Sequence, residues 1–187
     1  MAKKVTRDIK IVNIVVSASL EHDIPLEKMA ATLSNTEYNP EQFPGLVIRI
    51  KEPKTSALIF SSGKIVCTGA RTIEKVQESI KKIIKSLEKI NIKIKVKPEI
   101  KIQNIVASGS VGMDLNLNIL ATKLQNVEYE PEQFPGLVYK LQPSKTNPQA
   151  TFLLFSNGKI VCTGTKSEEE VHKALDKLIE NLKKVKA

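Results

Sequence analysis

The chain has little of what most enzymes and secreted proteins need. Its 187 residues contain no tryptophan, two cysteines, two histidines and only four aspartates. Cys67 and Cys162 are too few for a disulfide framework, and without a CxxC spacing they do not form a metal motif. An active site needs converging titratable groups, and these are scarce. We therefore expect a protein that is not an enzyme and that holds neither a metal nor a cofactor.

Long hydrophobic runs are also missing. No apolar stretch approaches the roughly 18 residues of a membrane-spanning helix. Residues 1–4, Met-Ala-Lys-Lys, lead into a mixed segment without the apolar block of a signal peptide. These features predict a soluble intracellular protein that does not associate with membranes.

What the chain does have is apolar content and positive charge. Hydrophobic residues make up 41% of it, enough for a globular core, and 29 Lys and Arg against 20 Asp and Glu give a net charge of +9. Such a balance makes a polyanion a reasonable partner. A run of lysines between Lys81 and Lys101 fits either nucleic-acid binding or the solvated face of a helix followed by a connector.

The sequence is written twice. NIVVSAS at 13–19 returns as NIVASGS at 104–110, and EYNPEQFPGLV at 37–47 returns as EYEPEQFPGLV at 128–138. FSSGKIVCTG, which begins at Phe60, returns as FSNGKIVCTG beginning at Phe155. The offset grows from 91 to 95, so the second copy carries a four-residue insertion around Gln142 to Gln149. We expect two subdomains, residues 1–95 and 96–187, related by an approximate two-fold axis.

Each copy has the pattern of a strand, a short helix, several strands and a long helix. Asp23 and Pro25 indicate a helix start, and Ser167 with Glu170 forms a capping box before the last helix. In the first copy the pattern predicts strands over 9–19, 37–40, 46–50, 56–60 and 65–68, a turn over 42–45, and a long helix over 72–87. Each copy therefore contains about five strands and two helices.

The expected strands carry apolar residues on both faces, although two helices can cover only one face of a five-stranded sheet. A second sheet layer, self-association or a dedicated ligand surface would cover the other. Cations recur at matched places in the two copies, as expected of a frame for phosphates. These pairs are Arg49 with Lys140, Lys64 with Lys159, and Arg71 with Lys166.

The paired EYNPEQFPGLV and EYEPEQFPGLV turns, with SGKIVCTG, NGKIVCTG, NIVVS and NIVAS, resemble the TATA-box-binding protein family in its archaeal form. The resemblance covers nearly the whole chain. It implies an α+β fold in which two direct repeats form a saddle-shaped, pseudo-symmetric molecule. A curved ten-stranded antiparallel sheet would carry four helices on its convex face. The implied function is a general transcription initiation factor that binds and bends TATA-box promoter DNA through the minor groove.

The resemblance assigns roles to individual residues. The wedges that enter base steps would be Phe43, Phe60, Phe134 and Phe155. Minor-groove base contacts would come from Asn13, Asn104, Thr68, Thr163, Val15, Val106, Val66, Val161, Leu58 and Leu153. Phosphate contacts would come from Arg49, Lys140, Lys64, Lys159, Arg71 and Lys166.

The same resemblance implies partners besides double-stranded promoter DNA. Transcription factor B would contact Glu130, Glu132 and Gln133 in the second turn and bring in RNA polymerase indirectly. The location would be the cytoplasm of a cell without a nucleus, at the nucleoid. Two other functions stay open: a protein-interaction module that uses the apolar sheet face, including as a homodimer when free, and an RNA-binding accessory domain.

Overall fold

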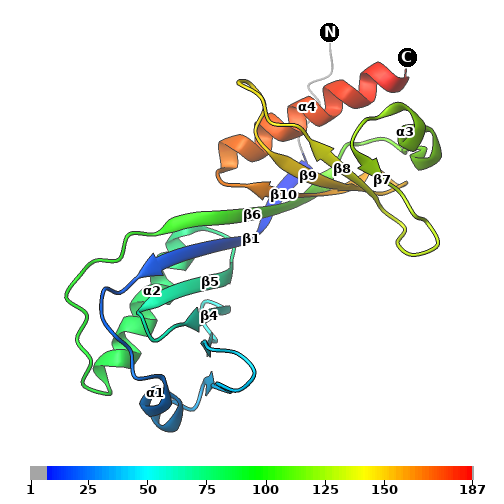
Figure 1. Ribbon diagram of the computed structural model, residues 1–187. Helices are drawn as coiled ribbons and strands as arrows, with labels where there is room; N and C mark the ends of the chain where they lie inside the picture. Colours follow the sequence, from blue (N-terminus) through cyan, green and yellow to red (C-terminus); the bar gives the residue numbers. More distant parts are fainter. Residues whose placement is uncertain (1–7, 187) are drawn as a thin grey trace. The chain divides into compact units, whose positions relative to one another are not determined.

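The computed structural model describes residues 8–186 (Figure 1). Residues 1–7, where the sequence predicts no signal peptide, and residue 187 lie outside the described part. The first repeat contains β1 (Asp8–Ser19), α1 (Leu26–Thr32), β2 (Thr36–Glu37), β3 (Leu46–Ile50), β4 (Thr55–Ile59), β5 (Lys64–Ala70) and α2 (Ile73–Glu88). The second contains β6 (Lys101–Ser110), α3 (Leu117–Lys123), β7 (Val127–Glu128), β8 (Leu137–Leu141), β9 (Ala150–Leu154), β10 (Lys159–Thr165) and α4 (Glu168–Lys186).

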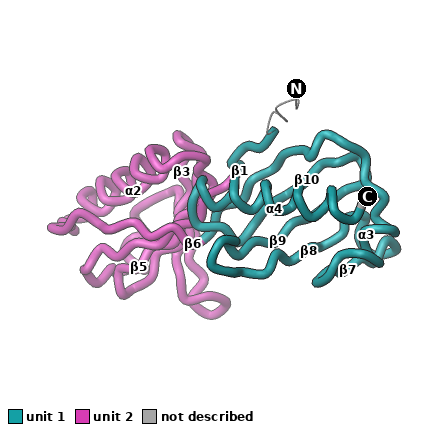
Figure 2. Tube along the Cα trace, turned by 90° about the horizontal axis from the view of Figure 1, so that it is seen from above, with its two compact units in different colours: residues 1–12, 104–187 teal, residues 13–103 magenta. Residues whose placement is uncertain are grey.

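The strands form one antiparallel sheet in the order β2-β3-β4-β5-β1-β6-β10-β9-β8-β7. The expected α+β class, ten strands and four helices are confirmed. Two compact units divide the chain: residues 13–103 form one, and residues 104–186 with 8–12 form the other (Figure 2).

In the unit of residues 13–103, side chains alternate between the two faces of the sheet. Ile48 on β3, Ile59 on β4, Cys67 on β5 and Val16 on β1 are buried, at 1% exposure or less. The apolar side of α2, which includes Ile83, is buried with them. Their neighbours on the opposite face are only half-buried. The helix thus covers one face, and the other stays open.

The second unit repeats this arrangement. Phe152 on β9, Cys162 on β10 and Leu178 on α4 have no exposed surface. Tyr139 on β8 joins the core through its ring, and its hydroxyl accepts a hydrogen bond from Asn181 Nδ2 of α4 at 2.7 Å. That contact satisfies the one polar atom that the ring carries inward.

The starts of the short helices differ from the prediction. Asp23 does not cap α1, because the helix begins at Leu26 after Pro25 and no side chain bonds its first turn. In the second unit the cap is Asn116, whose Oδ1 accepts from the N–H of Ile119 at 3.1 Å. A proline fixes the backbone before α1 and has no N–H to satisfy, which makes a side-chain cap less necessary.

The expected capping box at α4 forms in a shifted version. Ser167 Oγ accepts from the N–H of Glu170 at 3.1 Å, as predicted. The carboxylate of Glu170, however, accepts from the N–H of Lys166 at 2.6 Å, one residue before the expected partner. Both bonds still satisfy donors at the helix start.

The strands next to the middle of the sheet carry matched β-bulges. Between β1 and β5 the register runs from Val16 opposite Cys67 to Ile14 opposite Ala70, so β5 has one extra residue. The β6–β10 pair shows the same shift, because Cys162 lies opposite Ala107 and Thr165 opposite Ile105. The bulges contain Gly69 and Gly164, with φ angles of 103° and 91°, where a side chain would be strained.

Within residues 8–186 no helix is long and apolar enough to cross a membrane. Across the same residues, no group of three or more His, Cys, Asp or Glu side chains is placed to hold a metal ion.

Candidate nucleic-acid interface

An apolar row crosses the open face of the unit 13–103. Cross-strand pairing places Val47 beside Leu58, Leu58 beside Val66, and Val66 beside Ser17. Val15 lies on the same face of β1, and the four apolar side chains are half-buried. They form a smooth floor that has no carbonyl or carboxylate side chain.

A polar row runs parallel to it. Arg49 pairs with Ser56, and Ser56 pairs with Thr68. The side chain of Asn13 donates from Nδ2 to Thr68 Oγ1 at 3.0 Å and so completes the row on β1. The open face therefore has a hydrogen-bonding edge beside its apolar floor.

The second unit carries the same two rows. Its apolar row joins Val138, Leu153 and Val161 to Ser108, with Val106 on the same face. Its polar row joins Lys140, Thr151 and Thr163 to Asn104, which donates to Thr163 Oγ1 at 3.0 Å. The ten residues assigned to base contacts thus lie on the open faces of the two units.

The amide groups of both asparagines are held in one orientation. Because the bulge takes Gly69 out of the strand ladder, its N–H donates instead to Asn13 Oδ1, at 2.7 Å. Gly164 donates to Asn104 Oδ1 at the same distance. A peptide N–H can only donate, so the oxygen must face the glycine and the NH₂ the threonine. One amide hydrogen of each asparagine remains for an acceptor above the sheet.

In the unit 13–103, two phenylalanines meet on the side of the floor that faces away from the polar row. Phe60 follows β4, and Phe43 lies in the preceding turn with 41% of its surface exposed. The ring centroids are 5.9 Å apart with planes at 65°, an edge-to-face contact. A Cβ on Gly45 would lie 2.7 Å from Phe43 Cε1 and 3.1 Å from Phe60 Cε1, so only glycine leaves room for both rings.

Phe134 and Phe155 form the matching pair of the second unit. Their centroids are 6.0 Å apart at 69°, and Phe134 is 42% exposed. Gly136 has the role of Gly45, because a Cβ there would lie 2.7 Å from Phe134 Cε1. All four predicted wedges therefore stand in pairs beside the apolar rows, on the side away from the polar rows.

The predicted phosphate contacts are exposed. Lys64, Lys159, Arg71 and Lys166 make no ion pair with another residue in the described part of the chain. Arg49 differs, because its Nη1 lies 3.2 Å from Glu37 Oε2 with both side chains more than half exposed. An exposed pair of this kind contributes little stability and exchanges readily for a phosphate.

The two turns before the exposed phenylalanines have the same backbone but different charge. In the second turn the N–H groups of Gln133 and Phe134 both donate to Glu130 O at 3.0 Å. In the first, Asn39 O accepts the equivalent two bonds. Glu130, Glu132 and Gln133 are exposed. The carboxylate of Glu130 is therefore presented by a rigid turn and has no counterpart on the first.

The insertion of the second repeat folds on itself. Ser144 N donates to Asn147 O at 3.0 Å, and Ser144 Oγ accepts from the N–H groups of Thr146 and Asn147. Lys140 still pairs with Thr151 across β8 and β9. The insertion therefore lengthens the loop without changing the register of the polar row.

The two cysteines lie on the helix-covered face, opposite the open one. Burial raises the pKa of the Cys67 thiol to about 11. Burial also raises the pKa of Cys162 to about 12, against a smaller opposing effect of its hydrogen bond with Thr165. Both thiols are therefore protonated and unreactive near neutral pH.

Sequence reasoning missed the residues that support the predicted contacts. Gly69 and Gly164 orient the asparagines, Gly45 and Gly136 make room for the ring pairs, and Glu37 lies beside Arg49. The repeated CTG and FPG motifs contain the four glycines. Their repetition was a usable signal, whereas the bulge that explains two of them depends on register.

Comparison with protein families gives one match that covers both repeats. The model of the family described as "Transcription factor TFIID (or TATA-binding protein, TBP)" matches residues 8–90 and 99–185.

Relatives and a solved structure agree with that match. A TATA-box-binding protein of Archaeoglobus fulgidus is 49% identical over 177 residues, which cover 94% of each chain. One of Methanocaldococcus jannaschii is 50% identical over 178 residues, covering 95% of each. The solved structure titled "Methanococcus jannaschii TBP" superposes with a TM-score of 0.87 at 50% identity and covers 95% of this chain and 99% of its own.

Proposed function

The chain belongs to the TATA-binding protein family, whose members act in transcription initiation by binding promoter DNA, and on that premise we propose that its open faces bind and bend the minor groove of A·T-rich DNA. The observation that carries the proposal is the repeated layout of each open face. An apolar floor lies between a phenylalanine pair and an asparagine with one unused amide hydrogen. The repeats 1–95 and 96–187 would each contribute half of the contact.

The open faces favour A·T over G·C pairs for a physical reason. In the minor groove an A·T pair shows only acceptors, whereas a G·C pair adds the amino group of guanine. The asparagine amides supply donors for those acceptors. A guanine amino group pressed against Val66 or Leu58 would lose its water without gaining a partner. Because A·T and T·A look alike in this groove, the faces distinguish them poorly.

The phenylalanine pairs supply the bending. Apolar side chains inserted between base steps unstack them and kink the duplex toward the major groove, which lets a wide surface follow the DNA. Phe43 and Phe134 are exposed, so they can enter a step without leaving the core. Phe60 and Phe155 pack against them edge to face and would enter the base steps with them.

The six matched cations hold the phosphates beside these contacts. They are Arg49, Lys64 and Arg71 in the first repeat and Lys140, Lys159 and Lys166 in the second. If these six alone neutralise phosphates, log K should fall against log salt with a slope of about −5, at roughly −0.9 per contact.

The turn of the second repeat is the proposed docking site for transcription factor B, which would bring RNA polymerase to the promoter. Glu130, Glu132 and Gln133 are exposed on a turn fixed by two backbone bonds. Before DNA binds, the same apolar faces would allow two copies to associate, and DNA would then compete with that dimer. Promoter binding would place the protein at the nucleoid.

Bending of a doubly labelled duplex, measured by fluorescence resonance energy transfer over a salt series, tests the proposal. One duplex carries a central TATA-like element and the other a G·C-rich sequence of equal length. We expect a large bend on the first only, with the salt slope given above. Equal binding to both duplexes, or binding without a bend, would favour the hypothesis that the open faces bind protein.

A further inference from the structure

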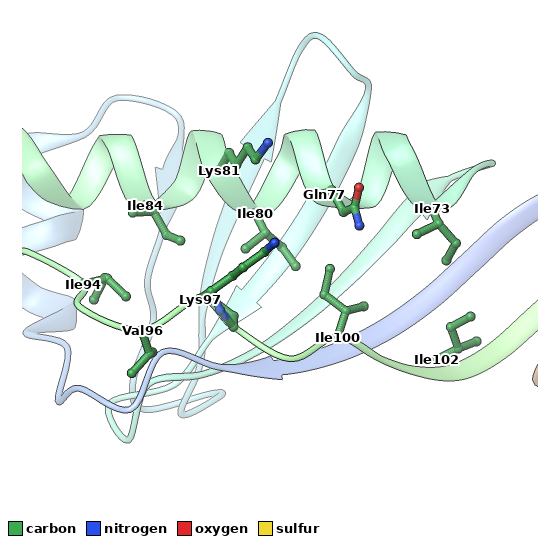
Figure 3. Close-up of a pocket in the computed structure, with 11 residues that line it drawn as sticks. Ile73, Gln77, Ile80, Lys81, Ile84, Ile94, Val96, Lys97, Ile100 and Ile102 are labelled. Atoms are coloured by element: carbon green, nitrogen blue, oxygen red, sulfur yellow. The ribbon is translucent and has the colours of Figure 1, made fainter.

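The helix-covered side of the unit 13–103 contains an apolar groove that the open face does not use. It lies between α2 and the segment that leads from α2 to β6, residues 93–100, which we call the connector. Figure 3 shows Ile80 and Ile84 on α2. Across the groove from them lie Ile94, Val96 and Ile100 of the connector. The groove encloses about 590 Å³, room for several large side chains.

The connector has the form of a strand without a partner. Ile94, Val96, Pro98 and Ile100 are half-buried and alternate with exposed residues, the period of an extended chain. Within the described part of the chain, residues 93–100 form no backbone hydrogen bond. Unpaired N–H and C=O groups along an extended segment can accept a further strand.

The rim of the groove is positively charged. Lys81 of α2 and Lys97 of the connector line it, and Lys93 and Lys95 are exposed on the connector. Neither Lys81 nor Lys97 pairs with a carboxylate elsewhere in residues 8–186. Two lysines of the run therefore do more than solvate a helix face, because they border an apolar groove.

The charges that border this groove are not repeated at the matched positions of the second repeat. Lys81 corresponds to Asp176 of α4, and Gln77 corresponds to His172. Three glutamates, Glu168 to Glu170, occupy the first turn of α4. The charge pattern of the groove thus belongs to the first repeat alone.

We propose that this groove binds an acidic, extended segment of a partner protein in which apolar and acidic residues alternate. The segment would pair with the connector as an added strand. Its apolar side chains would enter the space between Ile84 and Val96, and its carboxylates would lie beside Lys81 and Lys97. Charge complementarity and the unpaired backbone together select this occupant. A nucleic acid could satisfy the lysines, but it offers nothing to fill the apolar walls.

A direct binding assay with the whole protein tests the proposal. The probe is a fluorescein-labelled peptide of alternating leucine and aspartate, about eight residues long to match the connector. We expect saturable binding by fluorescence anisotropy, weakened about tenfold by the double variant Lys81→Glu, Lys97→Glu. Val96→Asp, which places charge in the apolar wall, should also weaken it. In ¹⁵N NMR spectra, the chemical-shift changes caused by adding the peptide should cluster at residues 73–84 and 93–102.

Two control variants separate the groove from general effects. Lys183→Glu on α4 changes the same charge elsewhere, and Ile119→Asp changes another exposed apolar residue; both should bind the peptide like the wild type. Equal weakening by Lys183→Glu would overturn the proposal, as would equal binding of a peptide with its leucines and aspartates in separate blocks. Displacement of the peptide by G·C-rich DNA would instead identify the lysines as a nucleic-acid site.

The outcome is independent of the proposed promoter function. The assay contains no TATA-like duplex, and the groove lies on the face of the unit that α2 covers. Saturating TATA-like DNA should leave peptide affinity unchanged. Failure of the bending experiment with intact peptide binding, or the reverse, would show which of the two proposals is wrong.

Discussion

The N–H of Gly69 donates to the side-chain oxygen of Asn13 at 2.7 Å, and through this bond a bulge in β5 sets the direction of an amide on β1. The glycine N–H is available only because the extra residue takes it out of the ladder. The same relationship joins Gly164 to Asn104 in the second unit. The register of the strands therefore determines which way the asparagine N–H donors of the open face point.

Replacing Asn13 in two ways separates orientation from recognition. In Asn13→Asp a carboxylate oxygen still accepts from Gly69, so the free energy of unfolding should stay near the wild-type value. In Asn13→Ala the N–H of Gly69 loses its acceptor, and the free energy of unfolding should fall by about 1–3 kcal/mol. Both variants lack the amide donor, so both should lose at least tenfold in affinity for TATA-like DNA. Urea denaturation and anisotropy measure the two effects; equal stabilities would contradict the role of Gly69.

The two bulge glycines should differ in their tolerance of alanine. Both have positive φ angles, which cost a side chain about 1–3 kcal/mol. At Gly69 a Cβ would also lie 3.1 Å from Lys54 O, whereas at Gly164 the nearest atom is 3.8 Å away. Gly69→Ala should therefore lower the melting temperature more than Gly164→Ala. Calorimetry of the two variants gives the comparison, and the reverse order would be inconsistent with the geometry.

Removal of the exposed wedges should affect bending far more than stability. Phe43 and Phe134 are about two-fifths exposed, so Phe43→Ala with Phe134→Ala removes less buried area than a core substitution would. Energy transfer in the TATA-like duplex should fall toward that of free DNA, while the melting temperature changes little. Lys183→Ala on α4 is the control and should bend DNA normally. Equal bending by the two proteins would show that the rings are not wedges.

Charge reversal on the second turn should act on the ternary complex alone. Glu130→Lys should leave the affinity for DNA intact and weaken the binding of transcription factor B about tenfold. The substitution replaces a carboxylate at the proposed docking site by a cation, which would repel a partner surface that is complementary to the carboxylate. Asn39→Lys makes a similar change at the matched position of the first turn. Mobility-shift titrations of factor B on preformed DNA complexes compare them. If Asn39→Lys weakens the complex as much as Glu130→Lys, the docking site is not confined to the second turn.

The buried thiols should make stability fall at alkaline pH. Folding raises the pKa of Cys67 from 9.0 to about 11, so an unfolded thiol ionises before a folded one. The stabilisation is complete below about pH 9 and is lost as the pH rises toward 11. Cys162 acts in the same direction. Urea denaturation between pH 8 and 10.5 should show a smaller decline for Cys67→Ala, Cys162→Ala; an identical decline would exclude the thiols as its source.

The sequence predicted the parts of the fold that repetition and periodicity encode. The repeated FPGLV motif marks the start of β3 and of β8, and the repeated GKIVCTG motif covers most of β5 and of β10. The stripe of Val76, Ile80 and Ile83 predicts α2. The prediction that Asp23 caps α1 is wrong, because Pro25 precedes the first residue of the helix and no side chain caps it. The bulge at Gly69 was out of reach, because register depends on the pairing of distant strands. Residues 93–100 alternate charged with mostly apolar side chains, but they overlap the lysine run, so the sequence alone does not distinguish a groove wall from a solvated connector.

The glycine–asparagine hydrogen bond, the apolar floor and the phenylalanine pair occur once in each repeat, and nearly the same residues form them. Two faces of nearly identical composition would give the proposed DNA contact almost no polarity of its own. Under the proposed promoter function, the direction of transcription would depend on residues that differ between the two repeats. Asn39 against Glu130 and Lys81 against Asp176 are such places.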